Sequence, residues 1–163
     1  MRPDRPELVA MWLGAVSTAL LVGALGFQYL GHLPPCEMCM WQRWPHLAAA
    51  ILGIVGGWVV SRTAQRHPLA APLAFLTALL VAISGLIGAY HAGVEWHWWP
   101  GPSQCTGTAV KYTATLDLNA PVVMCDRAAW RLFGISMAGY NAIISLGAAA
   151  IGIVLILRSR RTP

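Results

Sequence analysis

The chain has 163 residues, of which 57% are hydrophobic and only 10% are charged, and its formal net charge is +5 at pH 7. A soluble domain of this length cannot bury so much apolar surface, so the composition predicts one membrane domain, residues 1–163, with no second domain. The basic residues lie at the ends of apolar segments and form no patch, which argues against nucleic-acid binding.

Four apolar segments follow one another, and we expect them at about 8–30, 41–60, 69–90 and 133–157. Each is long enough to span the ~30 Å hydrocarbon core, because a helix rises 1.5 Å per residue. The sequence therefore predicts an all-α membrane protein. It is a four-transmembrane-helix bundle with a short outer loop at 31–40 and one long outer loop at 91–132.

The first segment carries no charge and is too long for the apolar region of a signal peptide, so we expect a retained membrane helix. Gly14, Gly23 and Gly26 suggest the close approach of a neighbouring helix. Pro34 and Pro35 follow the segment and disfavour its continuation.

Cys36 and Cys39 form a Cys-x-x-Cys pair directly before the second segment. Two thiols at this spacing close a small, strained ring that is readily reduced and re-oxidised. Arg43 lies four residues after Cys39, on the same helical face, where it would favour the thiolate. Alone, such an arginine is typical of a snorkelling anchor, but beside Cys39 we favour a functional role. Pro45 fits a first helical turn.

The third segment is followed by His91, which alone is typical of an interfacial hydrogen-bonding group. Three tryptophans suited to the membrane–water boundary come next: Trp96, Trp98 and Trp99. Asn141 lies inside the fourth segment, so we expect it to face a partner helix or a cavity.

The orientation follows from the charges at the two ends of the spans. Four spans place both termini and the connection 61–68 on one side, with seven arginines and two acidic residues. The other side has four basic and four acidic residues. The positive-inside rule places the arginine-rich side in the cytoplasm. All four cysteines then lie in periplasmic loops, where disulfides persist.

Cys105 and Cys125 form a second pair in the long loop, and the four cysteines admit three interpretations. Two structural disulfides would explain Cys105 and Cys125, since closing a loop of about 20 residues stabilises by roughly 3 kcal/mol, but would explain Cys36 and Cys39 poorly. A Cys₄ zinc site usually needs two short knuckles, and the second pair is not one. A thiol–disulfide relay explains both pairs, with a lipid-soluble quinone as the natural electron acceptor. We therefore expect no metal.

The arrangement resembles the DsbB family of bacterial inner-membrane disulfide oxidases. The matching features are Cys36 and Cys39 after a proline, Arg43 four residues on, and a second outer cysteine pair. The run from Cys125 through Trp-Arg-Leu-Phe-Gly and the run from Tyr90 to Trp96 also resemble this family.

The resemblance implies a reaction sequence. A periplasmic thioredoxin-like oxidase of the DsbA type is re-oxidised by a Cys105–Cys125 disulfide, with Cys105 in the mixed disulfide. Electrons pass to Cys36 and Cys39 and then to ubiquinone or menaquinone. Arg43 matches the family's quinone-site arginine, and His91 matches a histidine near that site.

Two alternatives belong to other classes. One is a quinone reductase of the vitamin K epoxide reductase type, where the redox Cys-x-x-Cys usually lies late in the chain and not early as here. The other is a non-enzymatic membrane protein with two structural disulfides, or a small channel or transporter subunit. The scarcity of intramembrane charge argues against ion transport.

Overall fold

The computed structural model describes residues 5–63, 68–106 and 123–159. Several residues used in the charge count lie outside these ranges: Arg2, Asp4, Arg66, Lys111, Asp117, Arg160 and Arg161. The described chain contains four helical spans long and apolar enough to cross a membrane, at Pro6–Tyr29, Glu37–Thr63, Ala70–Glu95 and Met137–Ser159. The prediction of an all-α four-helix membrane bundle is confirmed.

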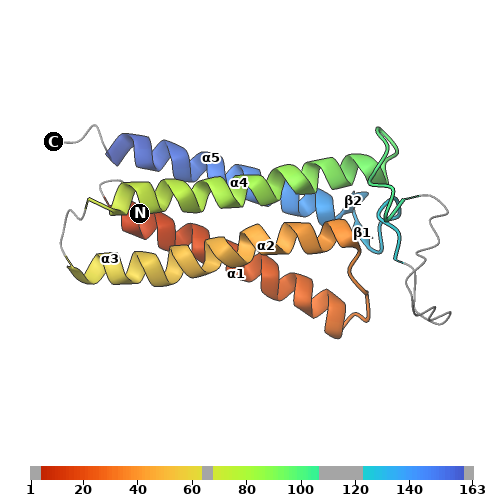
Figure 1. Cartoon of the computed structure of the whole chain (residues 1–163), viewed down its shortest axis with the longest axis horizontal. Coiled ribbons are helices and arrows are strands. Elements are labelled where there is room, and N and C mark those ends of the chain that lie inside the picture. The colour runs from red at the N-terminus through yellow and green to blue at the C-terminus, as the bar shows by residue number, and fades with distance from the viewer. Residues whose placement is uncertain (1–4, 64–67, 107–122, 160–163) are drawn as a thin grey trace.

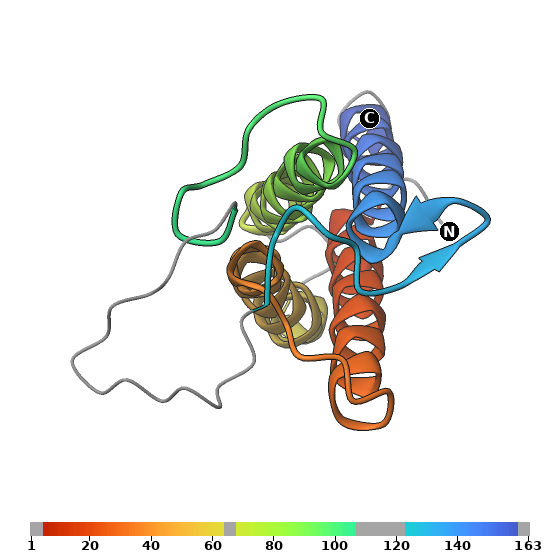
Figure 2. The same cartoon turned by 90° about the vertical axis from the view of Figure 1, so that its right-hand side faces the viewer.

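The first span is helix α1 (Pro6–Tyr29), and the second combines α2 (Glu37–Ile51), a π-helical turn η1 (Leu52–Gly56) and α3 (Gly57–Thr63). The third is α4 (Ala70–Glu95) and the fourth α5 (Met137–Ser159). Seen from the cysteine end, the spans follow one another around the bundle in the order α1, α2, α4, α5 (Figure 2). The start of α1, the end of α3 and the end of α5 lie at the opposite end from the hairpin and the cysteine loops (Figure 1).

Small side chains fill the core between α4 and α5. Ala74, Ala78 and Val81 of α4 are fully buried, and Ala148 and Ala149 of α5 join the same cluster. Large apolar side chains on the outer faces are exposed, among them Leu86 and Ile151. This distribution suits a membrane bundle, whose helices meet through small residues and turn large apolar ones toward lipid.

Helix α1 packs closely against η1 near its middle and then diverges from α2 toward the cysteine end (Figure 1). A Cβ on Gly53 would lie 2.8 Å from Gly14 Cα, so the backbones meet there as expected for Gly14. The same expectation was wrong for Gly23 and Gly26, where an added Cβ would have no neighbouring atom within 4 Å because α1 has diverged.

Helix α2 begins at Glu37, four residues earlier than expected. Cys36 caps it, since the Cys36 side chain accepts a hydrogen bond from Cys39 N at 3.2 Å. Cys39 therefore lies in the first helical turn and not in the loop 31–40. Pro45 lies inside the helix, not in its first turn.

The other two boundaries also differ from the expectation. Helix α4 continues to Glu95, so His91 lies inside the helix and not in the loop 91–132. The fourth helix begins at Met137, because a two-stranded hairpin, β1 (Arg131–Leu132) and β2 (Ile135–Ser136), precedes it. The hairpin turns through Phe133 and Gly134, which both have positive φ, as two-residue hairpin turns require.

Candidate functional site

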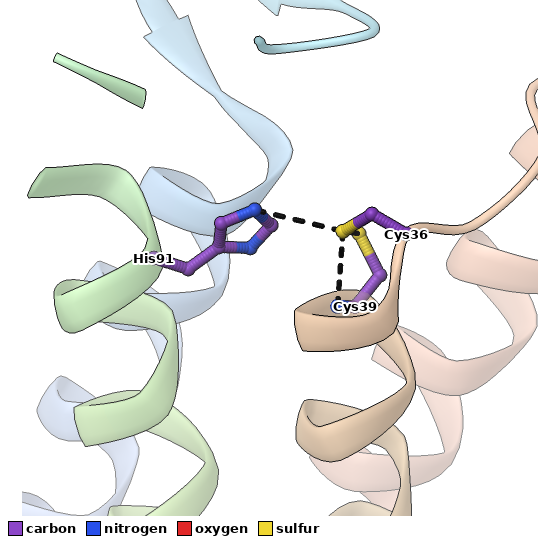
Figure 3. A group of neighbouring side chains, drawn as sticks. All are labelled: Cys36, Cys39 and His91. Carbon is purple, nitrogen blue, oxygen red and sulfur yellow. Dashed lines mark hydrogen bonds between the residues drawn. The ribbon is translucent and has the colours of Figure 1, made fainter. Parts of the chain in front are cut away.

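Cys36, Cys39 and His91 meet at the cysteine end of the bundle, as Figure 3 shows. The Sγ atoms of Cys36 and Cys39 are 2.6 Å apart, and Cys36 Sγ lies 3.6 Å from His91 Nε2. Both cysteines are free thiols in this structure. A disulfide needs an S–S distance of about 2.05 Å, so these thiols can form one with little movement of the helix.

The Cys36 thiol is buried at the N-terminal end of α2. Its hydrogen bond with the Cys39 side chain raises the pKa of Cys36 far above its ordinary value, and burial adds to the effect. Cys36 is therefore protonated at neutral pH while both thiols are reduced. Its sulfur can act as a nucleophile only after that proton has left.

The second cysteine pair lies against the first. Cys105 and Cys125 form a disulfide across 20 residues, and both are buried. They pack in one cluster with Cys36, Met38 and Val94, and Cys39 lies at its edge. The fold thus brings all four predicted cysteines together.

Arg43 lies one turn below Cys39 and reaches across to α1. Its Nη1 donates to Gln28 Oε1 at 2.5 Å, and its Nη2 donates to the carbonyl of Ala24 at 3.4 Å. The guanidinium is therefore held by two separate bonds to the diverging half of α1.

A cavity of about 340 Å³ opens where α1 diverges from the rest of the bundle. Its wall includes Cys39, Arg43 and His91, together with apolar and aromatic side chains such as Phe27 and Trp130. The volume is within the range of small-molecule sites, roughly 300–1,000 Å³. The cavity therefore joins a redox-capable thiol, a fixed cation and a mainly apolar wall.

Three buried polar residues near the site were not identified from the sequence: Gln42, His46 and Glu95. Glu95 Oε1 lies 3.7 Å from His91 Nε2, and Gln42 Nε2 lies 2.9 Å from His91 Nδ1. One signal was present, because Gln42 and His46 are four residues apart in an apolar segment and share one helical face.

Metal-binding capacity at this place rests on three donor atoms. The Sγ atoms of Cys36 and Cys39 and a ring nitrogen of His91 lie within 4.8 Å of one another. Thiolate and imidazole are donor types that zinc accepts, usually with a fourth ligand. Within the described ranges, this is the only place where three such donors converge.

Comparison with known proteins gives a consistent result. A family model described as "Disulfide bond formation protein DsbB" matches residues 6–155. The chain is 25% identical over 163 residues to "Disulfide bond formation protein B" of a Polaromonas species, covering 96% of this chain and 94% of that one. It is 31% identical over 144 residues to the protein of the same name from Pasteurella multocida, covering 82% and 76%. No solved structure matches the chain.

Proposed function

Because the chain belongs to the DsbB family, we propose that this disulfide bond formation membrane protein is a thiol:quinone oxidoreductase. It re-oxidises a periplasmic thioredoxin-like oxidase of the DsbA type and passes the electrons to membrane quinone. The observation that carries this proposal is the packing of two cysteine pairs in one buried cluster beside the cavity. Two independent structural disulfides would not need to share one cluster.

The first exchange takes place at the outer pair. A partner thiolate attacks Cys105, and Cys125 leaves as the thiolate, so that a mixed disulfide forms. The second partner thiol then releases Cys105. The partner gains a disulfide, and Cys105 and Cys125 together gain two electrons and two protons.

The second exchange passes these electrons inward. Cys125 attacks Cys36 of an oxidised Cys36–Cys39 pair, and Cys39 leaves as the thiolate. Cys105 then attacks Cys125, which restores the outer disulfide and releases Cys36. The presence of Cys36 and Cys125 in one buried cluster supports this transfer.

The residues around the cavity fit a quinone. A bound quinone supplies an acceptor for two electrons and two protons, which the reduced Cys36–Cys39 pair gives up when it closes to a disulfide. Cys39 provides the electron donor, and Arg43 provides a fixed positive charge for a developing oxyanion. The apolar wall suits a lipid-soluble ligand and limits access of water. Either ubiquinone or menaquinone fits this description.

The proposed location is the bacterial inner membrane, with both termini cytoplasmic and the four cysteines periplasmic. Family membership supports the inner membrane. The grouping of the cysteine loops at one end of the bundle supports a common side for all four thiols (Figure 1). The charge distribution along the sequence supports the choice of side.

A direct test uses the purified protein in detergent with a reduced thioredoxin-like oxidase and a soluble ubiquinone or menaquinone analogue. We expect one quinone to be reduced for each partner disulfide formed, followed by quinone absorbance and by thiol titration. A Cys39→Ser variant should lose quinone reduction. Normal quinone reduction by that variant would contradict the proposal.

A further inference from the structure

A chain of buried hydrogen bonds leads from His91 into the centre of the bundle. Gln42 lies 2.9 Å from His91 Nδ1, and Asn141 Nδ2 donates to Gln42 Oε1 at 2.8 Å. Asn141 Oδ1 lies 2.9 Å from His46 Nε2, and His46 Nδ1 lies 3.1 Å from Ser17 Oγ. Polar side chains at this depth are costly unless paired, so the geometry of each bond matters.

Two backbone carbonyls determine the orientation of the amides in this chain. Gln42 Nε2 lies 3.1 Å from the carbonyl of Met38, and a carbonyl oxygen only accepts. The Gln42 NH₂ group therefore occupies that position, and Oε1 faces Asn141. Asn141 Nδ2 lies 3.2 Å from the carbonyl of Ser84, which orients Asn141 by the same argument.

The orientation of Asn141 is also fixed from its other side. Its Oδ1 accepts from Ser145 Oγ at 2.8 Å and faces His46 Nε2, so His46 carries its proton on Nε2. His46 Nδ1 then accepts from the Ser17 hydroxyl. Each hydrogen bond in the chain from Ser17 to Gln42 therefore has one defined donor and one defined acceptor.

The tautomer of His91 follows from this arrangement. The Gln42 NH₂ group donates to His91 Nδ1, so Nδ1 carries a lone pair and the ring proton lies on Nε2. The neighbours of Nε2 include Cys36 Sγ at 3.6 Å and Glu95 Oε1 at 3.7 Å, and both can accept. A proton on Nδ1 would instead oppose the Gln42 NH₂ group.

We propose that Gln42 and Asn141 are positioning residues that hold His91 as an Nε2–H donor toward the Cys36 sulfur. His91 then acts as a hydrogen-bond donor to Cys36 and not as its general base. The role rests on the proposed function, because it matters when Cys36 carries negative charge during disulfide exchange. Together with the Cys39 N–H at 3.2 Å, the Nε2–H gives this sulfur two donors in a buried site.

The direct test is ¹⁵N NMR of the reduced protein labelled at histidine, in detergent, with His91 assigned through a His91→Gln variant. Protonated and unprotonated ring nitrogens have well-separated ¹⁵N shifts. We expect the wild-type His91 to be protonated on Nε2 only. A ring protonated on Nδ1, neutral or cationic, would overturn the proposal.

Two substitutions at Gln42 sharpen the test. Gln42→Glu is nearly isosteric but only accepts when ionised, so His91 should switch to the Nδ1–H form. Gln42→Met removes the donor without adding charge, so both forms should be populated. Thr77→Val is the matched control, since it removes a buried hydroxyl that donates to the Leu73 carbonyl within α4, outside this chain of hydrogen bonds. His91 should stay in the Nε2–H form in that variant. An unchanged tautomer in both Gln42 variants would overturn the proposal.

The functional readout is the rate of partner oxidation at saturating quinone. Losing one hydrogen bond to a charged sulfur should slow Gln42→Met about tenfold, and Thr77→Val should stay near the wild-type rate. Unchanged activity of Gln42→Met, despite an altered tautomer, would contradict the positioning role. Because the NMR readout needs no quinone, a protein without quinone activity would refute the proposed function while the tautomer is still measured.

Discussion

Arg43 spans the wall of the cavity with both of its terminal nitrogens engaged. Nη1 donates to Gln28 and Nη2 to the carbonyl of Ala24, both on α1. A snorkelling anchor would direct its charge to water, whereas this guanidinium crosses from α2 to the diverging half of α1. The two bonds need a planar, forked group, which lysine does not provide.

We therefore predict that Arg43→Lys raises the apparent KM for quinone roughly tenfold, with little change in the KM for the soluble partner. Steady-state kinetics with each substrate varied in turn would measure the two effects separately. Arg62→Lys is a suitable control, because Arg62 lies at the other end of the bundle, over the Trp58 ring. An unchanged quinone KM in Arg43→Lys would assign Arg43 to a purely structural contact with α1.

At the scale of the helices, the backbones of α1 and η1 approach each other closely. A Cβ on Gly53 would lie 2.5 Å from the carbonyl oxygen of Ala10 and 2.8 Å from Gly14 Cα. Neither is the end of a flexible side chain, so the helices would have to separate. The same contact fixes where α1 begins to diverge and hence where the cavity opens.

Gly53→Ala should destabilise the fold by about 1–2 kcal/mol, because the steric cost exceeds the gain in helix propensity. Gly147→Ala is the matched control, since a Cβ there in α5 would meet no neighbouring side chain or helix of the described structure within 4 Å. That variant should be unchanged or stabilised by up to about 1 kcal/mol. Unfolding in SDS–detergent mixtures, followed by circular dichroism, would compare them. Equal stability of the two variants would show that the α1–η1 contact adapts easily.

Hydropathy located the four spans but not their ends. Helix α2 begins earlier than hydropathy predicts because the Cys36 side chain caps it. A hydropathy scale treats cysteine as an apolar residue and does not include its capping hydrogen bond. Helix α4 runs on to Glu95 because His91 and Glu95 find polar neighbours inside the fold. The hairpin before α5 depends on the positive φ of Phe133, a conformation that propensity does not predict for phenylalanine.

At the scale of the whole molecule, some residues of the site could be predicted from the sequence and others could not. The cysteines and Arg43 follow from local spacing, since a Cys-x-x-Cys and a cation one turn later are recognisable in one segment. The spacing of Gln42 and His46 is also visible in one segment, but their common partner Asn141 comes from α5 and follows only from the fold. Which helix faces which is a long-range property that no spacing within one segment contains.

The whole-molecule orientation leads to a topology prediction. After reduction, a membrane-impermeant thiol reagent should label Cys36, Cys39, Cys105 and Cys125 from the periplasmic side of intact spheroplasts. The reason is the excess of arginine at the other end of the spans. Inverted vesicles serve as the control and should be labelled only after permeabilisation. Labelling that requires inverted vesicles would reverse the proposed orientation.

The four cysteines lie together in one cluster, and single cysteine substitutions can separate a relay from two independent structural disulfides. In a relay, Cys105 forms the mixed disulfide with the partner and Cys125 carries the electrons on to Cys36. Cys36, Cys105 and Cys125 belong to one buried cluster, which suits both exchanges. Removing one cysteine at a time should therefore stop the series of disulfide exchanges at a defined covalent intermediate.

We predict that Cys125→Ser accumulates a Cys105–partner adduct when the partner is supplied in its oxidised form. The free Cys105 thiolate attacks the partner disulfide, and without Cys125 the outer pair has no second thiol to displace the partner. In the matched variant Cys105→Ser, the Cys125 thiolate should instead attack an oxidised Cys36–Cys39 pair and form a bridge with Cys36, while Cys39 leaves as the thiolate. Cys125 and Cys36 share one cluster, which favours this bridge. Non-reducing electrophoresis and mass spectrometry of the linked peptides would identify both species. Two structural disulfides would give neither species specifically, and both variants would then lose activity only in proportion to lost stability.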